Sequence, residues 1–410
     1  MANGQPVVTA RERRGAVSLL LAMVLLGVFP LDVLLPSFPA LAGHFRSTPT
    51  DIALSISLFA VGVAFAQLLI GPLSDLIGRK GLLLAGMSVS MLGAVGCVLS
   101  NDYTLFLLFR ILQALGCGCF VLSQALVQDL FEGEERDRLR ILMVTATGIF
   151  ISVSPLAGTF LQASLGWRGS FWVFTALAAV VMFKAWLFLE NTRPLTKGNA
   201  TGFLKGYRRV FADFDFVGYW LISAFAFACH FSFIVTSPLI FMDQLQMTAY
   251  DFSLILLIYG AAYIVGGIVA AVLSRRMTPD HQIIAGLSLI LLSGLMLLYL
   301  SSNFALSAAT VLMPMLICTA GTTIARPAAT SRAMDLFPEI AGTSASAGST
   351  IIFICGGLIS ALISLSPANL QSTLGYSFVL ISGVALAVNR QISRRASLLL
   401  ANATAQPESE

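Results

Sequence analysis

The sequence predicts an all-α membrane protein with twelve transmembrane helices, arranged as two pseudo-symmetric six-helix bundles. Composition is the first reason: 57% of the residues are hydrophobic and 11% are charged, whereas soluble domains carry about 25% charged residues. Apolar runs such as Ala16–Leu35 and Ile284–Leu300 are the second, because a helix needs roughly 20 apolar residues to cross the hydrocarbon layer. The third is an internal repeat that relates the two halves of the chain.

The apolar runs between polar breaks define the expected spans. They lie near residues 16–36, 52–73, 81–100, 103–130, 139–163, 169–190, 215–242, 250–274, 282–301, 304–326, 340–364 and 371–389. The longest polar interruption separates the first six spans from the last six. The expected organisation is therefore an N-terminal bundle at 1–190, a cytoplasmic central loop at 191–214, a C-terminal bundle at 215–392 and a cytoplasmic tail at 393–410.

Basic residues predict the orientation. Nearly all arginines and lysines between spans fall on the side of the N-terminus, and the opposite loops hold only Arg46 and Arg168. By the positive-inside rule both termini are cytoplasmic, so the chain is expected to be a multi-pass protein of the cytoplasmic membrane. The net charge of +4 is too small to predict nucleic acid as a partner.

The internal repeat is visible in two pairs of segments. Gly71–Ser88 reads GPLSDLIGRKGLLLAGMS, and Ala271–Ser288 reads AVLSRRMTPDHQIIAGLS, with Leu-Ser, Ala-Gly and the final Ser in register. Asp-Leu-Phe at 129–131 recurs at 335–337, each time closing the fourth span of its half. Matching places in the two halves favour duplication over chance similarity. Parallel six-span halves with a site between them are a recurrent plan of transporters.

Several kinds of chemistry are not indicated. All six cysteines fall inside predicted spans at spacings that suit neither disulfides nor a zinc site, so small packing residues are the better interpretation. There is no P-loop for ATP, and no span carries a Ser/Lys dyad, paired aspartates or a His-Glu-x-x-His motif. We therefore expect no enzyme activity, no metal and no cofactor other than a proton as coupling ion.

Two charged residues stand inside the N-terminal spans. Arg110 lies about seven residues into the fourth span, and a guanidinium there is costly unless it is paired or faces water. Asp32, between Pro30 and Pro36, is the carboxylate well inside the first span. Desolvation and a facing cation such as Arg110 would oppose each other there, so protonation could fall within cellular pH. The alternatives are a snorkelling arginine and an acid wetted at the membrane surface.

The turn after the second span, GPLSDLIGRK at Gly71–Lys80, carries the most informative motif. Gly71 allows close helix approach, Asp75 stands at a helix end within reach of Arg79, and Gly78 permits a tight turn. An ordinary positive-inside loop would explain the basic residues but not the acid and both glycines.

This motif resembles the cytoplasmic signature of the major facilitator superfamily, apart from Leu76, where the family usually has a basic residue. The resemblance implies the fold described above. It also implies that Gly71, Asp75, Gly78 and Arg79 form a latch between the halves when the protein opens outward. Asp129 would join this latch.

The surroundings of Asp32 resemble the first-span signature of bacterial drug:proton antiporters, and the whole layout resembles their bicyclomycin/chloramphenicol-resistance (Bcr/CflA) type. Pro36 and Pro39 carry the first-span resemblance, and Arg110 followed by Gln113 resembles the superfamily's motif in the fourth span. The residues that support the Bcr/CflA layout are Gln67, Gln128, Asp129, Ser237, Pro238 and the segment 341–345. The resemblance implies location in a bacterial inner membrane and export, with Asp32 binding proton and substrate alternately. Arg110 would tune Asp32, and Gln67 and Gln113 are candidate substrate-binding residues.

Two further segments are candidates. Pro155 and Gly158 in the fifth span are similar to the antiporters' glycine–proline motif and predict a helix bend, although a kinked packing helix explains them too. In the seventh span, His230 and Phe231 are candidate substrate contacts, the alternatives being a neutral hydrogen-bonded histidine and a ring packed on lipid. Arg326, near the cytoplasmic end of the tenth span, either snorkels or acts as a gate or as a contact for an anionic substrate.

These features favour a monomeric antiporter that exchanges protons for small amphipathic molecules such as drugs. Two alternatives stay open because a fold does not fix a function. One is a proton-coupled exporter or symporter of a specific metabolite, such as a siderophore. The other is a membrane sensor that retains the fold without transport. The lipid bilayer, protons and a small-molecule substrate are the expected partners.

Overall fold

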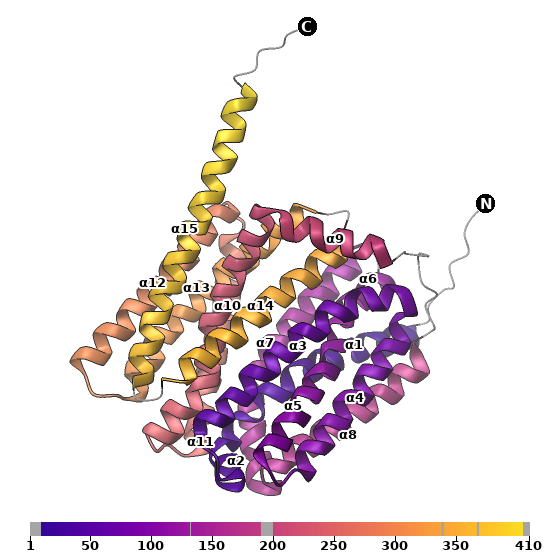
Figure 1. Ribbon diagram of the computed structural model, residues 1–410, viewed down its shortest axis with the longest axis vertical. Coiled ribbons are helices and arrows are strands. Elements are labelled where there is room, and N and C mark those ends of the chain that lie inside the picture. The colour runs from indigo at the N-terminus through magenta and orange to yellow at the C-terminus, as the bar shows by residue number, and fades with distance from the viewer. Residues whose placement is uncertain (1–9, 132, 190–199, 338–339, 367–368, 405–410) are drawn as a thin grey trace. The chain divides into compact units, whose positions relative to one another are not determined.

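The computed structural model describes residues 10–131, 133–189, 200–337, 340–366 and 369–404, and this part of the chain is helical (Figure 1). Its α-helices are α1 (Ala10–Asp32), α2 (Phe38–Phe45), α3 (Pro49–Ile77), α4 (Arg79–Leu99), α5 (Tyr103–Cys117), α6 (Leu122–Leu130), α7 (Gly133–Leu165), α8 (Trp167–Phe188), α9 (Ala200–Ala212), α10 (Phe214–Pro238), α11 (Ala249–Leu273), α12 (Pro279–Asn303), α13 (Ala308–Asp335), α14 (Ala341–Ser364) and α15 (Leu370–Thr404). Short 3-10 turns lie at Leu35–Ser37 and Gly118–Val121, and a π-helical turn lies at Leu239–Gln244. Within the described residues, 12 helical segments are long and apolar enough to cross a membrane, which confirms the predicted fold class.

Local sequence explains where several helices begin. Asp102 precedes α5 and its carboxylate accepts a hydrogen bond from the Leu105 amide at 3.1 Å. Asp213 does the same for α10, accepting from the Phe216 amide at 2.7 Å. Such side chains accept hydrogen bonds from amides that have no partner inside the helix. Each therefore favours the start of the helix at the residue that follows it.

The structure differs from the predicted organisation at several places, and three of them concern the fourth span, the central loop and the tail. The fourth span is not one helix, because α5 and α6 are separated by the 3-10 turn at Gly118–Val121. The central loop contains α9, an amphipathic helix that buries Tyr207 and Val210 and exposes Arg208. The last helix continues through the predicted tail to Thr404, and its C-terminal part projects beyond α12 and α13 in Figure 1. The charged residues after the predicted last span end the apolar run, but the helix α15 continues through them.

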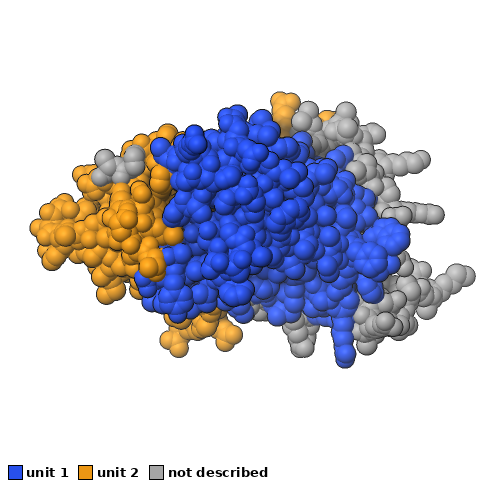
Figure 2. Space-filling model, turned by 90° about the horizontal axis from the view of Figure 1, so that it is seen from below, with its two compact units in different colours: residues 1–48, 62–199, 249–260 blue, residues 49–61, 200–248, 261–410 orange. Residues whose placement is uncertain are grey.

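The chain forms two compact units, coloured separately in Figure 2. Unit 1 holds residues 1–48, 62–199 and 249–260, and unit 2 holds residues 49–61, 200–248 and 261–410. The predicted six-helix bundles therefore differ from the compact units at 49–61 and 249–260. Specific contacts inside each unit explain both exchanges.

In unit 1, the first half of α11 packs on α7. The Ser253 hydroxyl donates to the Pro155 carbonyl at 3.1 Å and lies 2.5 Å from the Thr159 hydroxyl. A Cβ placed on Gly260 would lie 2.6 Å from the Cα of Ser152, so the two helices approach backbone to backbone. Small and hydroxyl residues are those that allow membrane helices to pack this closely.

In unit 2, the first half of α3 packs on α14 in the same manner. The hydroxyls of Ser57 and Ser360 lie 2.8 Å apart, and both residues are buried. A Cβ on Gly357 would lie 2.8 Å from the Ser57 carbonyl oxygen. The first half of α3 is therefore fastened to unit 2.

The internal repeat has a structural counterpart in one helix pair of each unit. A Cβ on Gly116 of α5 would lie 2.6 Å from the carbonyl oxygen of Gly86 in α4. A Cβ on Gly321 of α13 would lie 2.5 Å from the carbonyl oxygen of Gly286 in α12. Gly86 and Gly286 occupy the Ala-Gly step that the two repeated segments share. The same close helix contact thus occurs at equivalent places in both halves.

Candidate functional site

Asp32 is the last residue of α1, and a turn at residues 33–34 follows it and leads into the Leu35–Ser37 segment. The carbonyls in the last turn of a helix have no amide partner within the helix. Here the Phe29 carbonyl accepts from the Val33 amide at 3.3 Å, whereas the Pro30 carbonyl accepts from Arg110. The Asp32 side chain is only 8% exposed, so this helix end lies inside unit 1.

Arg110 is the eighth residue of the 15-residue helix α5, and it is completely buried. Its guanidinium donates to the Pro30 carbonyl at 3.0 Å and to the Gln113 side-chain oxygen at 2.8 Å. It also lies 5.7 Å from the centre of the Phe171 ring. A snorkelling side chain would be partly exposed. The complete burial of Arg110 therefore excludes the alternative that this arginine snorkels to the membrane surface.

The expected pairing of Arg110 with Asp32 is absent. In the described part of the chain, no hydrogen-bond donor or cation lies within bonding distance of the Asp32 carboxylate. Arg110 instead holds the backbone two residues before Asp32. The arginine therefore positions the turn that carries the acid, and the acid itself is left available to other partners.

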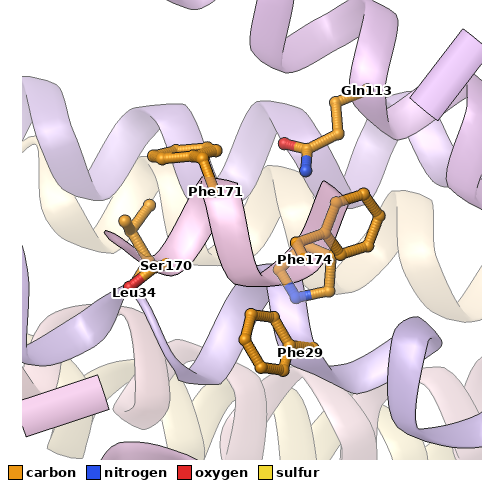
Figure 3. Close-up of a pocket in the computed structure, with 7 residues that line it drawn as sticks. Phe29, Leu34, Gln113, Ser170, Phe171 and Phe174 are labelled. Atoms are coloured by element: carbon orange, nitrogen blue, oxygen red, sulfur yellow. The ribbon is translucent and has the colours of Figure 1, made fainter. Parts of the chain in front are cut away.

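A small cavity lies beside this network, shown in Figure 3. It has a volume of about 10 Å³, which is space for about one water molecule. Gln113 lines it together with Phe29, Phe174 and Ser170, and the Gln113 amide points toward Phe174 in the figure. The Gln113 amide nitrogen is buried and has no hydrogen-bond partner among the described residues. The Gln113 side-chain oxygen thus accepts from Arg110, and its amide nitrogen remains available as a hydrogen-bond donor.

Helix α7 supports the Asp32 turn from the opposite side. A Cβ on Gly158 would lie 2.2 Å from the Val33 carbonyl oxygen and 3.2 Å from Pro36. Only a glycine fits here, because the backbone of α7 touches the residue that follows Asp32. Pro155 lies inside the continuous helix α7, and its carbonyl accepts from Ser253.

The residues predicted to form a latch are only partly described. Gly78 links α3 to α4 with φ 92° and ψ 149°, a backbone conformation that side chains rarely allow, so the turn requires a glycine. Arg79 begins α4, and Gly71 lies in the last turns of α3. The side chains of Asp75 and Asp129 lie outside the described residues.

The remaining candidates divide between the units. Gln67 is buried in the part of α3 that belongs to unit 1. His230 and Phe231 are buried in α10 of unit 2, where the His230 ring lies 5.3 Å from that of Tyr263. Two contacts were missed from the sequence, Phe171 on Arg110 and Ser253 on Pro155. No local signal identifies them, because both join residues that are far apart in the chain.

Comparison with known proteins agrees with this architecture. In the described residues, twelve helical segments are long and apolar enough to cross a membrane, and charged groups such as Asp32 and Arg110 are buried, as in multi-pass membrane proteins. Residues 17–362 match the Major Facilitator Superfamily, and the chain belongs to this family. The family assignment confirms the broader of the two sequence resemblances.

Two relatives illustrate the similarity. The uncharacterized MFS-type transporter YdgK of Bacillus subtilis is 29% identical over 267 residues, covering 64% of this chain and 66% of that protein. Multidrug resistance protein MdtL of Escherichia coli is 26% identical over 223 residues, covering 54% of this chain and 57% of that protein. The chain therefore matches less than two thirds of the length of either relative.

Solved structures share the fold at low identity. The D-xylose-proton symporter superimposes with a TM-score of 0.75 at 15% identity, over 91% of this chain and 97% of that one. A bacterial homologue of the human lysosomal transporter Spinster superimposes with a TM-score of 0.72 at 14% identity, over 94% and 98%. At such identities the likeness concerns the fold alone.

Proposed function

We propose that this protein is a proton-coupled exporter of small amphipathic molecules, of the Bcr/CflA type, in a bacterial inner membrane with both termini cytoplasmic. Export would proceed by alternating access, with protons and substrate moving in opposite directions. The observation that carries the proposal is the buried Asp32 carboxylate, which has no donor or cation beside it in the described part of the chain. A carboxylate in that setting is costly to keep charged and alone, so it binds either a proton or a substrate group.

Arg110 has a positioning role in this proposal. Its two hydrogen bonds keep the Pro30 carbonyl and the Gln113 side chain in place, and they hold the end of α1 against α5. Because the guanidinium cannot deprotonate in a protein, it acts as a constant anchor while Asp32 changes state. The inward movement of one proton is driven by about 2.3 kcal/mol per 100 mV of membrane potential, together with any pH gradient.

Two comparisons support the cargo and the mechanism. The name of MdtL, Multidrug resistance protein, supports small drugs as substrates. The shared family supports transport driven by a gradient rather than by ATP. A specific metabolite remains the alternative cargo, and the partly exposed Arg326 in unit 2 favours an anionic one.

The proposal is tested by transport in proteoliposomes with an imposed pH gradient. Ethidium serves as a cationic probe and chloramphenicol as a neutral one. We expect wild-type protein to move at least one of them against its gradient, and Asp32→Asn to abolish this movement. Asp102→Asn is the matched control, because an exposed asparagine caps α5 as well as an aspartate does.

Three outcomes would contradict the proposal. Undiminished gradient-driven transport by Asp32→Asn would remove Asp32 from the coupling. Movement of protons and probe in the same direction would identify a symporter. The absence of any flux, across a wide panel of compounds and gradients, would favour a membrane sensor.

A further inference from the structure

Arg326 differs from Arg110 and Arg332, two other arginines that lie inside long helices of this chain. Arg110 is hydrogen bonded to Pro30 and Gln113, and Arg332 forms a two-point contact with Asp280, at 3.2 Å and 2.5 Å. Within the described residues, Arg326 makes no hydrogen bond and no ion pair. Its guanidinium lies 4.9 Å from the centre of the Phe227 ring, and the side chain is partly exposed.

Arg326 does not reach toward the end of its helix. Side chains in a helix lean toward its N-terminus, which directs Arg326 away from the C-terminal end of α13. Its contact, Phe227, is the 14th of the 25 residues of α10, so the guanidinium lies at the middle of that span. A cation at this depth is costly without a partner, and snorkelling does not provide one.

Hydrogen bonds between α10 and α13 lie one turn before and one turn after Arg326. One turn before Arg326, the Thr322 hydroxyl donates to the Ala226 carbonyl at 3.1 Å. One turn after it, the Thr330 hydroxyl lies 3.0 Å from that of Ser223. The first bond lies beside Phe227 and the second lies one turn of α10 before it, so the two bonds hold the helices that carry Arg326 and Phe227 in register.

Further aromatic rings cluster around Phe227. Phe227 stacks on Phe231, with ring centres 5.3 Å apart, and meets Phe353 edge-on at 5.6 Å. The His230 and Tyr263 rings, themselves 5.3 Å apart, adjoin the same group. Phe353 and Tyr263 are partly exposed, as Arg326 is. All of these residues belong to unit 2.

We propose that Arg326, with Phe227, Phe353 and Tyr263, binds the carboxylate of a substrate that has an aromatic body. A guanidinium that stacks on a ring keeps its N–H groups in its own plane, where they match the two oxygens of a carboxylate. The partly exposed rings of Phe353 and Tyr263 offer apolar surface for the rest of the molecule. This names the substrate class of the proposed exporter.

The test compares 2-naphthoate with 2-naphthamide, which share a ring system and differ in the carboxylate. Binding to the purified full-length protein is measured by calorimetry without any gradient. We expect wild-type protein to bind the naphthoate at least about tenfold more tightly, as charged hydrogen bonds provide. Arg326→Gln should remove this preference and leave naphthamide binding intact, which also shows that the variant is folded. Arg326→Lys should keep part of the preference, and Arg332→Gln, in the same helix, should keep all of it.

Two results would overturn the inference: equal or undetectable binding of both probes by the wild-type protein, or a preference that survives in Arg326→Gln. If Arg326→Gln does not fold, the comparison rests on Arg326→Lys, where an undiminished preference would equally overturn it. This experiment is independent of proton coupling. A failed proton assay would refute the proposed exporter without altering these affinities, and a lost preference would refute only the substrate class.

Discussion

Replacing Gly158 by alanine should disturb the turn that carries Asp32. The added Cβ would lie 2.2 Å from the Val33 carbonyl oxygen, and ordinary contact begins at 3.4 Å. The backbones of α7 and of the segment after α1 must therefore separate by about 1.2 Å. Overpacking of this kind costs about 1–3 kcal/mol. A displacement of about 1 Å next to a reacting group can also slow a reaction by about 100-fold.

The chain offers a matched control. A Cβ on Gly383, an exposed position inside α15, meets no atom within 4 Å. Alanine at either position gains the same helix propensity, about 1 kcal/mol relative to glycine. This gain is the same in both variants, so it cancels when their free energies of unfolding are compared. We therefore expect Gly158→Ala to be about 1–3 kcal/mol less stable than Gly383→Ala.

Stability is measured by unfolding both variants in detergent, and activity by transport in proteoliposomes. Gly383→Ala should be at least as stable as the wild-type protein and equally active. Gly158→Ala should unfold earlier and transport up to about 100-fold more slowly. Equal stability and equal transport in the two variants would refute the close contact between α7 and Val33.

Three other substitutions test separate parts of the structure. Arg110→Lys keeps the charge but cannot hold both acceptors, so it should lose about 1–3 kcal/mol and slow transport about tenfold or more; wild-type transport rates would show that only the charge matters. Gly78→Ala should lower the free energy of unfolding by about 1–3 kcal/mol, because its φ is 92°, and an unchanged unfolding midpoint would contradict this turn. The side chains of Arg332 and Asp280 are 38% and 40% exposed, so a double-mutant cycle on this pair should give a coupling free energy of unfolding below about 1 kcal/mol. A larger coupling would mean that the pair is shielded from water.

The spans were predictable because lipid imposes a simple rule on sequence. A helix that crosses a bilayer must be apolar and must satisfy its own backbone groups, and polar residues mark its ends. The expected spans 81–100 and 169–190 thus agree with α4 and α8 within a few residues. The rule says nothing about helices outside the membrane. That is why α9 and the extension of α15 to Thr404 were missed.

The candidate site was less predictable, because it depends on distant contacts. The sequence identifies Asp32 and Arg110 by the cost of charge inside a span, and both are buried in the structure. Charge complementarity then predicts that they pair. Arg110 instead donates to the Gln113 side chain and to the backbone carbonyl of Pro30, which has no helical amide partner because α1 ends there. A backbone carbonyl without an amide partner cannot be recognised from the side chains in a sequence, so only the three-dimensional structure identifies it.

Arg326 is a third case, in which the sequence left two alternatives open. Its place near the end of the predicted tenth span favoured snorkelling over substrate contact. The structure extends that span to Asp335 and places the guanidinium over Phe227. Predicted span ends determine how deep a residue is expected to lie, so an end placed at residue 326 instead of 335 changed the expected role of this arginine.

The exchange of a proton for substrate at Asp32 is the central claim of this account. It is tested most directly by proton release when substrate binds to purified protein in a weakly buffered solution. The ligand is the compound that most raises the unfolding temperature in a screen of drugs and metabolites. We expect about one proton released per substrate bound by the wild-type protein, and none by Asp32→Asn under conditions where it still binds the ligand. Equal proton release by the two proteins would contradict the claim.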